Sequence, residues 1–173
     1  MDRERIEGWA DLLRQNGCDA DVIRHCRAVA GLALRIAART PGADMDRVAA
    51  GAMLHDLGRA VTHGPGHAAA GAHLAAALGQ PADVVDIIRT HIGAGIPPAE
   101  AAAAGLPEGD YMPRSLEARI VAHADNLLAG CTRQTAAACA SHLADAGLAA
   151  AGDRVLALHR ELSALAGIDL DLI

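Results

Sequence analysis

An adjacent histidine and aspartate, His55 and Asp56, lie within the run Ala-Gly-Ala-Met-Leu-His-Asp-Leu-Gly-Arg, which is mostly apolar. Burying an imidazole beside a carboxylate costs free energy unless a cation lies between them. Other apolar stretches carry further side chains of the kind that bind metals: His25, His67, His91 and Asp125. Five predicted helices that aim such side chains at one core indicate a metal site.

The spacing of apolar residues predicts that these side chains point inward. Around His25, apolar residues recur every three or four positions, which is typical of the buried face of a helix. The same spacing accompanies His67, His91 and Asp125. The aspartate is the most informative, because an unpaired buried carboxylate costs several kcal/mol.

Histidine and carboxylate ligands without cysteine suit Mn²⁺, Fe²⁺, Zn²⁺, Co²⁺ or Ni²⁺. One ion would be completed by a first group of ligands: His25, His55, Asp56 and Asp125. His67 and His91 would complete a second ion, with Asp56 as a bridge. We therefore predict a divalent transition-metal cofactor, as a pair of ions.

The elements that position these residues are predicted to be helices separated by Gly and Pro. We expect an all-α bundle of about seven to nine helices, in which residues 1–173 form a single compact domain. The metal-binding core would span about 20–130, with helices of 131–173 packed on it. Expected helices cover about 2–16, 19–40, 44–57, 67–78, 81–91 and 98–104, and others begin near 115, 133 and 153. Segments 59–66 and 105–113 are predicted loops.

Net charge and hydropathy limit the classes of binding partner that we expect for this chain. A formal charge of −6 argues against a general nucleic-acid binder, whereas a small phosphorylated substrate, such as a nucleotide, remains compatible because metal ions supply local positive charge. No stretch is long and apolar enough for a membrane span. A cytoplasmic location is expected. Cys18, Cys26, Cys131 and Cys139 are interpreted as reduced packing residues. The Ala-rich segment 136–151 could bury the face of a homodimer.

The order of the predicted ligands resembles the HD superfamily of metal-dependent phosphohydrolases. Its pattern of His, His-Asp and a distant Asp is found at His25, His55-Asp56 and Asp125, over about residues 20–130. His67-Ala-Ala-Ala-Gly71 and Thr90-His91-Ile-Gly resemble the additional ligands of one subgroup. Together with Gly-Leu-Pro-x-x-Asp-Tyr-x-Pro, these segments look like a small, mainly archaeal and functionally undefined family of stand-alone HDIG-type proteins.

The resemblance implies a fold and a reaction. The fold would be a single HD domain, and the reaction would be hydrolysis of a phosphoester or phosphoanhydride, with a nucleotide or dinucleotide polyphosphate as the favoured substrate. A metal-activated water would attack phosphorus. Asp56 would hold the metals and could accept a proton, Arg59 would bind the phosphate, and His63 could act as a general acid. Arg59 could instead stabilise a helix end, and His63 could be a solvated loop residue.

Two alternatives belong to other functional classes. One is a di-iron oxygenase, a chemistry that some HD proteins perform with similar ligands. The other is a non-catalytic nucleotide-binding module stabilised by metal. For two further residues the sequence leaves the role open: His123 is compatible with a packed core histidine, and Tyr111 could stack on a base or support a loop.

Overall fold

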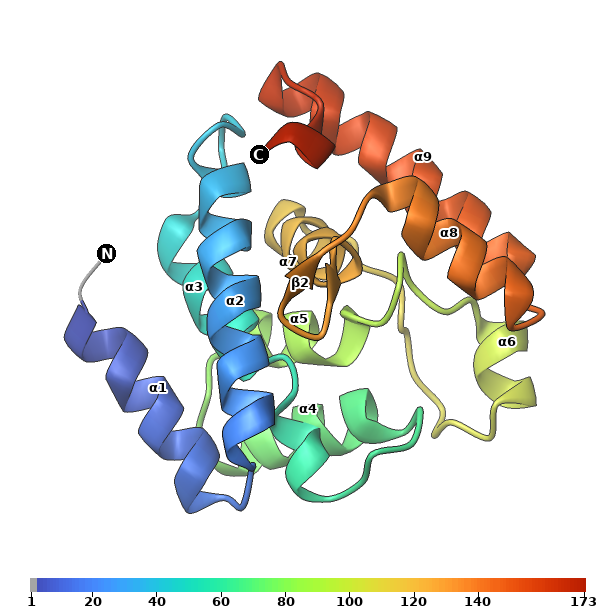
Figure 1. The fold of residues 1–173 in the computed structure, drawn as a ribbon. Helices are drawn as coiled ribbons and strands as arrows, with labels where there is room; N and C mark the ends of the chain where they lie inside the picture. The colour runs from blue at the N-terminus through green and yellow to red at the C-terminus, as the bar shows by residue number, and fades with distance from the viewer. Residues whose placement is uncertain (1–2) are drawn as a thin grey trace.

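The computed structural model describes residues 3–173, which form nine α-helices, two short 3₁₀ helices and one small hairpin (Figure 1). The all-α prediction is confirmed for this part of the chain; position 2, where the first helix was expected to begin, lies outside it. The elements are α1 (Arg3–Gln15), α2 (Ala20–Ala37), α3 (Met45–Leu54), η1 (Leu57–Ala60), α4 (His67–Ala77), α5 (Ala82–Thr90), α6 (Pro98–Ala103), α7 (Leu116–Asn126), β1 (Leu128–Ala129), β2 (Thr132–Arg133), α8 (Ala136–Asp145), α9 (Ala149–Ala166) and η2 (Leu170–Leu172).

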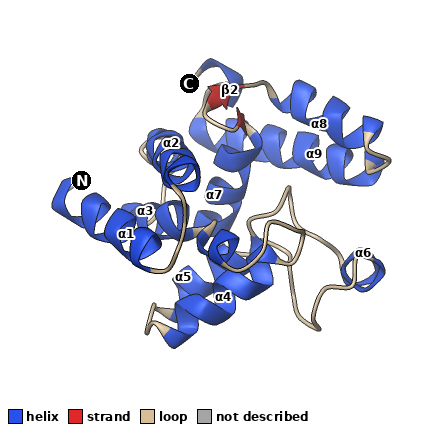
Figure 2. Ribbon diagram, turned by 60° about the horizontal axis from the view of Figure 1, so that its bottom comes forward, coloured by secondary structure: helices blue, strands red, loops and turns tan. Residues whose placement is uncertain are grey.

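Four helices, α2, α3, α5 and α7, contact one another around the centre of the molecule. Helix α1 packs on α2 and α3, while α4 packs on α5 and η1. Helix α6 is carried on a long loop to one side (Figure 2). Aliphatic side chains such as Leu54, Ile87 and Ile120 are fully buried between the central helices. The apolar stripes of the sequence therefore form the core, as their spacing predicts.

Side-chain caps fix where several helices begin. The carboxylate of Asp19 accepts hydrogen bonds from the backbone N–H groups of Asp21 and Val22 at the start of α2. Ser115 caps α7 and Thr135 caps α8 in the same way. Each cap satisfies N–H groups that have no partner within the helix. The register of α2 and α7 sets which way His25 and Asp125 face.

Around the His-Asp pair, the structure differs from the helix expected over 44–57. Helix α3 ends at Leu54, and Leu57–Ala60 form η1 where a loop was expected from residue 59. Gly58 does not end the helix in the left-handed backbone conformation, because its φ is not positive. A Cβ at this position would instead lie 1.9 Å from the carbonyl oxygen of His67. At Gly71, a Cβ would lie 2.8 Å from the backbone nitrogen of Gly58. The two glycines thus allow η1 and α4 to touch through their backbones.

The hairpin of β1 and β2 was not predicted. Leu128 pairs with Arg133 and Ala129 with Thr132, and Gly130 turns the chain with a φ of +60°. Glycine adopts this conformation without the steric penalty of a side chain. The hairpin delays the helix expected from about 133 until Ala136, while the last helix begins at Ala149 rather than near 153.

Helices α8 and α9 lie side by side, and α9 also contacts α7 (Figures 1 and 2). Val155 and Leu162 of α9 are fully buried. We propose that 131–173 fold cooperatively with the rest of the chain, because α9 contacts α7 as well as α8 and its buried residues belong to the same hydrophobic core as the central helices.

We expect Leu162→Ala to destabilise the whole protein by about 2–5 kcal/mol, since it removes a fully buried side chain and leaves a cavity. For a chain of this size, each kcal/mol corresponds to roughly 2–4 °C in Tm. Circular dichroism should show one transition at lower temperature. Leu165→Ala is the matched control, because Leu165 is 45% exposed. A separate early transition confined to part of the helical signal would contradict a single cooperative unit.

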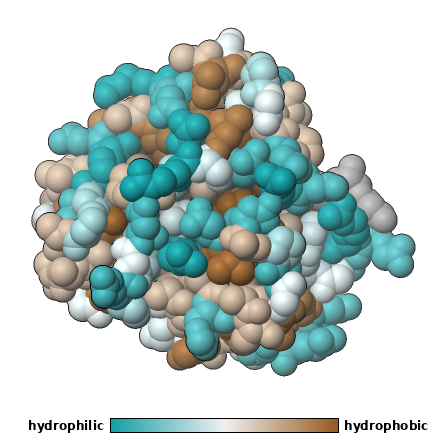
Figure 3. Space-filling view, turned by 180° about the vertical axis from the view of Figure 1, so that it is seen from behind, coloured by the Kyte–Doolittle hydropathy of each residue, from teal (hydrophilic) through white to brown (hydrophobic). Residues whose placement is uncertain are grey.

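Hydrophilic and hydrophobic side chains are mixed on the face seen from behind (Figure 3). Across residues 3–173, none of the helices combines the length and the apolar character needed to cross a membrane. Cys18, Cys26 and Cys139 are buried free thiols, as expected, but Cys131 is exposed and does not pack in the core.

Candidate metal centre

Four histidines are held in the same manner. The Nδ1–H of each ring donates to a backbone carbonyl oxygen, and because a carbonyl can only accept, the proton of the neutral ring must lie on Nδ1. This leaves Nε2 as a lone pair. The pairs are His25 with Gly130 at 2.7 Å, His55 with Ala52 at 2.8 Å, His67 with Gly64 at 2.9 Å, and His91 with Ile88 at 2.7 Å. Metal-bound histidines are oriented in this way by their surroundings.

The Nε2 atoms of these histidines face each other in two pairs. The distance between the two Nε2 atoms is 3.3 Å for His25 and His55 and 3.0 Å for His67 and His91. Two neutral rings with Nδ1–H would direct lone pairs at each other at these distances, which is unfavourable without a cation. The donor chemistry therefore fits a bound metal.

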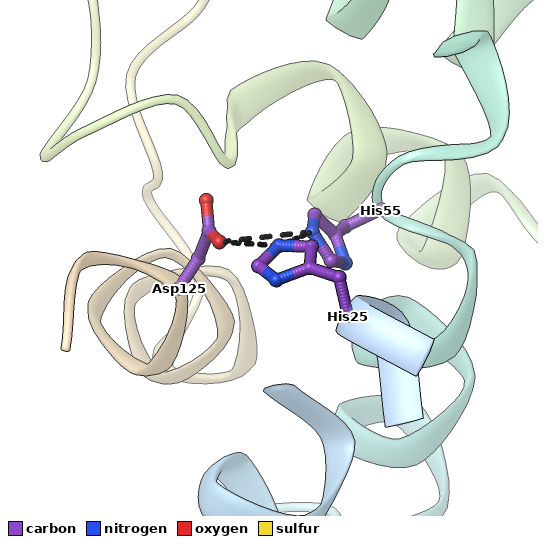
Figure 4. A group of neighbouring side chains, drawn as sticks. All are labelled: His25, His55 and Asp125. Atoms are coloured by element: carbon purple, nitrogen blue, oxygen red, sulfur yellow. Dashed lines mark hydrogen bonds and ion pairs between the residues drawn. The ribbon is translucent and has the colours of Figure 1, made fainter. Parts of the chain in front are cut away.

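Two carboxylates complete the arrangement. One oxygen of Asp125 lies 2.9 Å from Nε2 of His25 and 3.8 Å from Nε2 of His55 (Figure 4). Asp56 turns one oxygen to this pair and the other to the second pair, at 3.2 Å from Nε2 of His67. The structure thus brings all six predicted ligands together, with Asp56 between the two histidine pairs.

Burial and charge set the protonation of the centre. Burial acts to raise the pKa of Asp56, but the imidazoles of His55 and His67 outweigh it and hold this pKa far below its usual range. Burial lowers the pKa of His91 to about 4, with His55 adding to the effect. At neutral pH, Asp56 is therefore ionised and His91 is neutral, which are the states that bind a metal.

His25 leads to a prediction about pH. Burial acts to lower its pKa, but the hydrogen bond and charge of Asp125 outweigh burial and raise it to about 8. The pair of protonated His25 and ionised Asp125 stabilises the metal-free protein fully below pH 6.5, the ordinary pKa of histidine. This contribution is lost as the pH rises through about 8. Metal binding needs the neutral ring. Affinity should therefore rise with pH up to about 8.

Isothermal titration calorimetry in buffers of different ionisation enthalpy tests this expectation. At pH 7, binding of Mn²⁺ should release about one proton, and at pH 9 almost none. His25→Ala should abolish the difference between the two pH values. Equal proton release at both values in the wild-type protein would show that His25 is not the titrating ligand.

Arg59 lies at the edge of the centre. Its Nε–H donates to Asp56 at 3.1 Å, and a terminal nitrogen donates to the carbonyl oxygen of His63 at 3.1 Å. The side chain of His63 is exposed in the loop of residues 62–66, so the structure brings only its backbone to the site. Arg59 therefore connects this loop to the candidate ligand Asp56.

Sequence reasoning missed the backbone groups that orient the histidines. The Gly130 carbonyl depends on the hairpin, for which the Gly-Cys pair at 130–131 was the available signal. It also missed Asn126, which is 7% exposed and donates to the carbonyl oxygen of Gly93 at 2.9 Å.

His123 is a fully buried core residue whose Nε2 lies 3.1 Å from Nδ1 of His159. Tyr111 is 3% exposed and donates to the carbonyl oxygen of Pro107, so it supports its loop.

Comparison with known proteins identifies the family. The family model described as HD domain matches residues 22–130, which is more than half of the chain and includes all six candidate ligands. The chain belongs to the HD domain family. No solved structure is significantly similar to this HD protein.

Several curated proteins are similar over much of the HD protein. A tRNA (cytidine(56)-2'-O)-methyltransferase of Thermoplasma volcanium is 42% identical over 96% of this chain and 49% of its own length. A protein of the same name from Picrophilus torridus is 39% identical over 92% of this chain and 47% of its own length. The chain thus spans about half the length of these relatives. An uncharacterized protein of Methanocaldococcus jannaschii is 44% identical over 69% of this chain and 73% of its own length.

These names correct two predictions. The phosphohydrolase acting on a small nucleotide is wrong, because the relatives that span most of the chain are named as RNA-modifying methyltransferases. Neither alternative function, oxygenase or nucleotide-binding module, matches these names. The exclusion of nucleic acid as a partner is also wrong, because the named substrate of these relatives is a tRNA. It rested on the net charge of −6, and a charge summed over the chain does not describe the local charge at a metal centre.

Proposed function

We propose that this HD protein acts on tRNA, as the metal-binding and RNA-contacting domain in ribose 2′-O-methylation. The names of the two methyltransferase relatives support this role. Because the chain spans about half of their length, we assign methyl transfer itself to the part of those relatives that the chain does not cover. The observation that carries the proposal is a centre whose histidine pairs and carboxylates fit a bound cation, with a guanidinium at its edge.

In this proposal, six residues hold divalent ions of Mn, Fe, Zn, Co or Ni: His25, His55, Asp56, His67, His91 and Asp125. A bound divalent ion supplies positive charge for phosphate and ribose oxygens. Arg59 can add a forked pair of donors to the same phosphate group. Arg59 thus has a phosphate-binding role with RNA, and His63 contributes its backbone carbonyl, which holds Arg59, rather than its exposed side chain.

Exposure indicates the side from which RNA approaches. The side chains of His25, Asp125 and Arg59 are 17%, 24% and 30% exposed, whereas those of His55, Asp56, His67 and His91 are at most 7% exposed. The opening of the centre therefore lies at α2, α7 and η1. A polyanion that enters there meets Arg59 first.

The test is binding of a fluorescently labelled tRNA transcript, measured by anisotropy with Mn²⁺ and with a chelator. We expect metal to tighten binding at least about tenfold, equivalent to about 1.4 kcal/mol. Asp125→Asn should lose most of this gain, because it removes an accessible ligand. Asp145→Asn, an exposed aspartate at the end of α8, is the matched control.

DNA of the same sequence gives the specificity control. An RNA-directed domain should prefer the tRNA, since only RNA offers 2′-hydroxyl groups. Equal weak binding of metal-loaded protein to both polymers, without an effect of Asp125→Asn, would overturn the proposed function.

A further inference from the structure

A surface hollow of about 630 Å³ lies between α4, α5 and the loop that follows α6, the segment drawn in yellow in Figure 1. Ligand sites in proteins usually measure about 300–1,000 Å³, so the hollow has room for one nucleotide. It does not include the six candidate metal ligands, but Gly66, which lines it, directly precedes His67.

The α4 wall of the hollow consists of small alanine side chains and one imidazole. Ala69, Ala72 and Ala76 line it beside the exposed ring of His73, together with Val85 of α5. Side chains of this size leave a shallow apolar surface on which a planar ring can lie. Tyr111 closes the far side, but its ring is fixed by the hydrogen bond to Pro107 and is not free to move.

Arg89 supplies a positive charge to this apolar surface. Many arginines of the chain form ion pairs, such as Arg119 with Glu161 and Arg154 with Glu100. Within residues 3–173, the Arg89 guanidinium has neither an ion pair nor a hydrogen bond, although it lies in the electrostatic range of Asp86 and Asp110. An Arg without a partner beside an apolar wall is suited to a ligand with an anionic group and an apolar ring.

The hollow and the metal centre are joined by the loop of residues 62–66. Arg59 binds the carbonyl oxygen of His63 at one end of this loop, and Gly66 lines the hollow at the other. Three residues span at most about 10 Å. A short single strand can therefore reach from the hollow to the opening of the centre.

We propose that the hollow binds one unstacked nucleotide of the RNA that contacts the metal centre, with its phosphate on Arg89 and its base on the alanine wall of α4. This inference rests on the proposed function. Sequence-selective proteins commonly read RNA through such splayed bases. Glu108, which is exposed and lines the hollow, can accept a hydrogen bond from an exocyclic amino group. Cytosine or adenine should therefore bind better than uracil.

The test measures tRNA affinity in Mn²⁺ for two variants of the hollow. Arg89→Gln removes the charge at similar length, and Ala70→Phe fills the space, since Ala70 also lines the hollow. Each should weaken tRNA binding about five- to tenfold and leave the bound metal and the melting temperature unchanged. Arg160→Gln is the control, because Arg160 lies on α9, outside the hollow.

Photo-crosslinking adds a readout of position. A crosslinked nucleotide should map to peptides that contain residues 66–76 or 107–111. If both variants bind tRNA like the wild type while Arg59→Gln binds more weakly, the hollow is not an RNA site and the proposed function still stands. If the wild type binds no tRNA, both proposals are wrong.

Discussion

Asp56→Asn is expected to strip the protein of metal. Elemental analysis of protein purified without added metal should give about two ions per chain for the wild type and almost none for this variant. The reason is the position of Asp56, whose two oxygens face the two histidine pairs. Loss of an outer-shell partner alone typically costs 10–100-fold in metal affinity, and a shared ligand should cost more.

His67→Ala separates the two halves of the centre. It should retain about one ion, because the ligands around His25, His55 and Asp125 remain. Asp145→Asn should keep the wild-type content. A wild-type content in Asp56→Asn would show that the carboxylate does not bridge, and the centre would then be smaller than we infer.

Stability gives an independent measure of the same variant. An ion present at 100 times its Kd stabilises a protein by about 2.7 kcal/mol, or roughly 5–11 °C in Tm for a chain of this size. The wild type should show this rise when metal is added, and Asp56→Asn should not. With a chelator present, the wild type should lose the rise.

Gly58→Ala is expected to destabilise the protein strongly. The added Cβ would lie 1.9 Å from the carbonyl oxygen of His67 and 2.5 Å from the backbone nitrogen of Gly71. Both obstacles are backbone atoms, so η1 and α4 must move apart. Overpacking of a core typically costs about 1–3 kcal/mol, and this substitution should reach or exceed the upper end.

Because α4 carries His67, this movement should also weaken metal binding by the candidate ligands His67 and His91. Chemical denaturation and metal analysis of the same sample measure the two effects together. Gly31→Ala is the control, since a Cβ on Gly31, which lies in helix α2, would meet no atom within 4 Å. It should stabilise the helix by about 0.5–1 kcal/mol. A Gly58→Ala protein as stable as the wild type would show that the close backbone contact is not required.

The helices and the six candidate ligands were predictable because both depend on local spacing. An apolar residue every third or fourth position defines a buried helix face, and a His or Asp on that face must have a partner. The contact between Gly58 and Gly71 was not predictable in this way. It joins segments that are separate in sequence, and a glycine before a loop is more simply interpreted as the end of a helix.

The carbonyl groups that orient the rings could not be predicted from residue types, since every residue carries one. The hairpin was missed because strands of two residues leave no alternation to detect. The prediction that nucleic acid is not a partner was wrong for a different reason. Net charge averages over the whole surface, whereas binding of a polyanion depends on the charge at the place of contact.

The bond between His25 and Gly130 couples two parts of the molecule. The ring is held at 2.7 Å by a carbonyl at the turn of the hairpin, just before α8 and α9 begin. A partner that shifted these last helices would rotate the ring and change the affinity of the centre for its ion. By thermodynamic reciprocity, an ion in the centre would change the affinity of that partner by the same factor. The hairpin thus links the orientation of a candidate metal ligand to the position of the C-terminal helices.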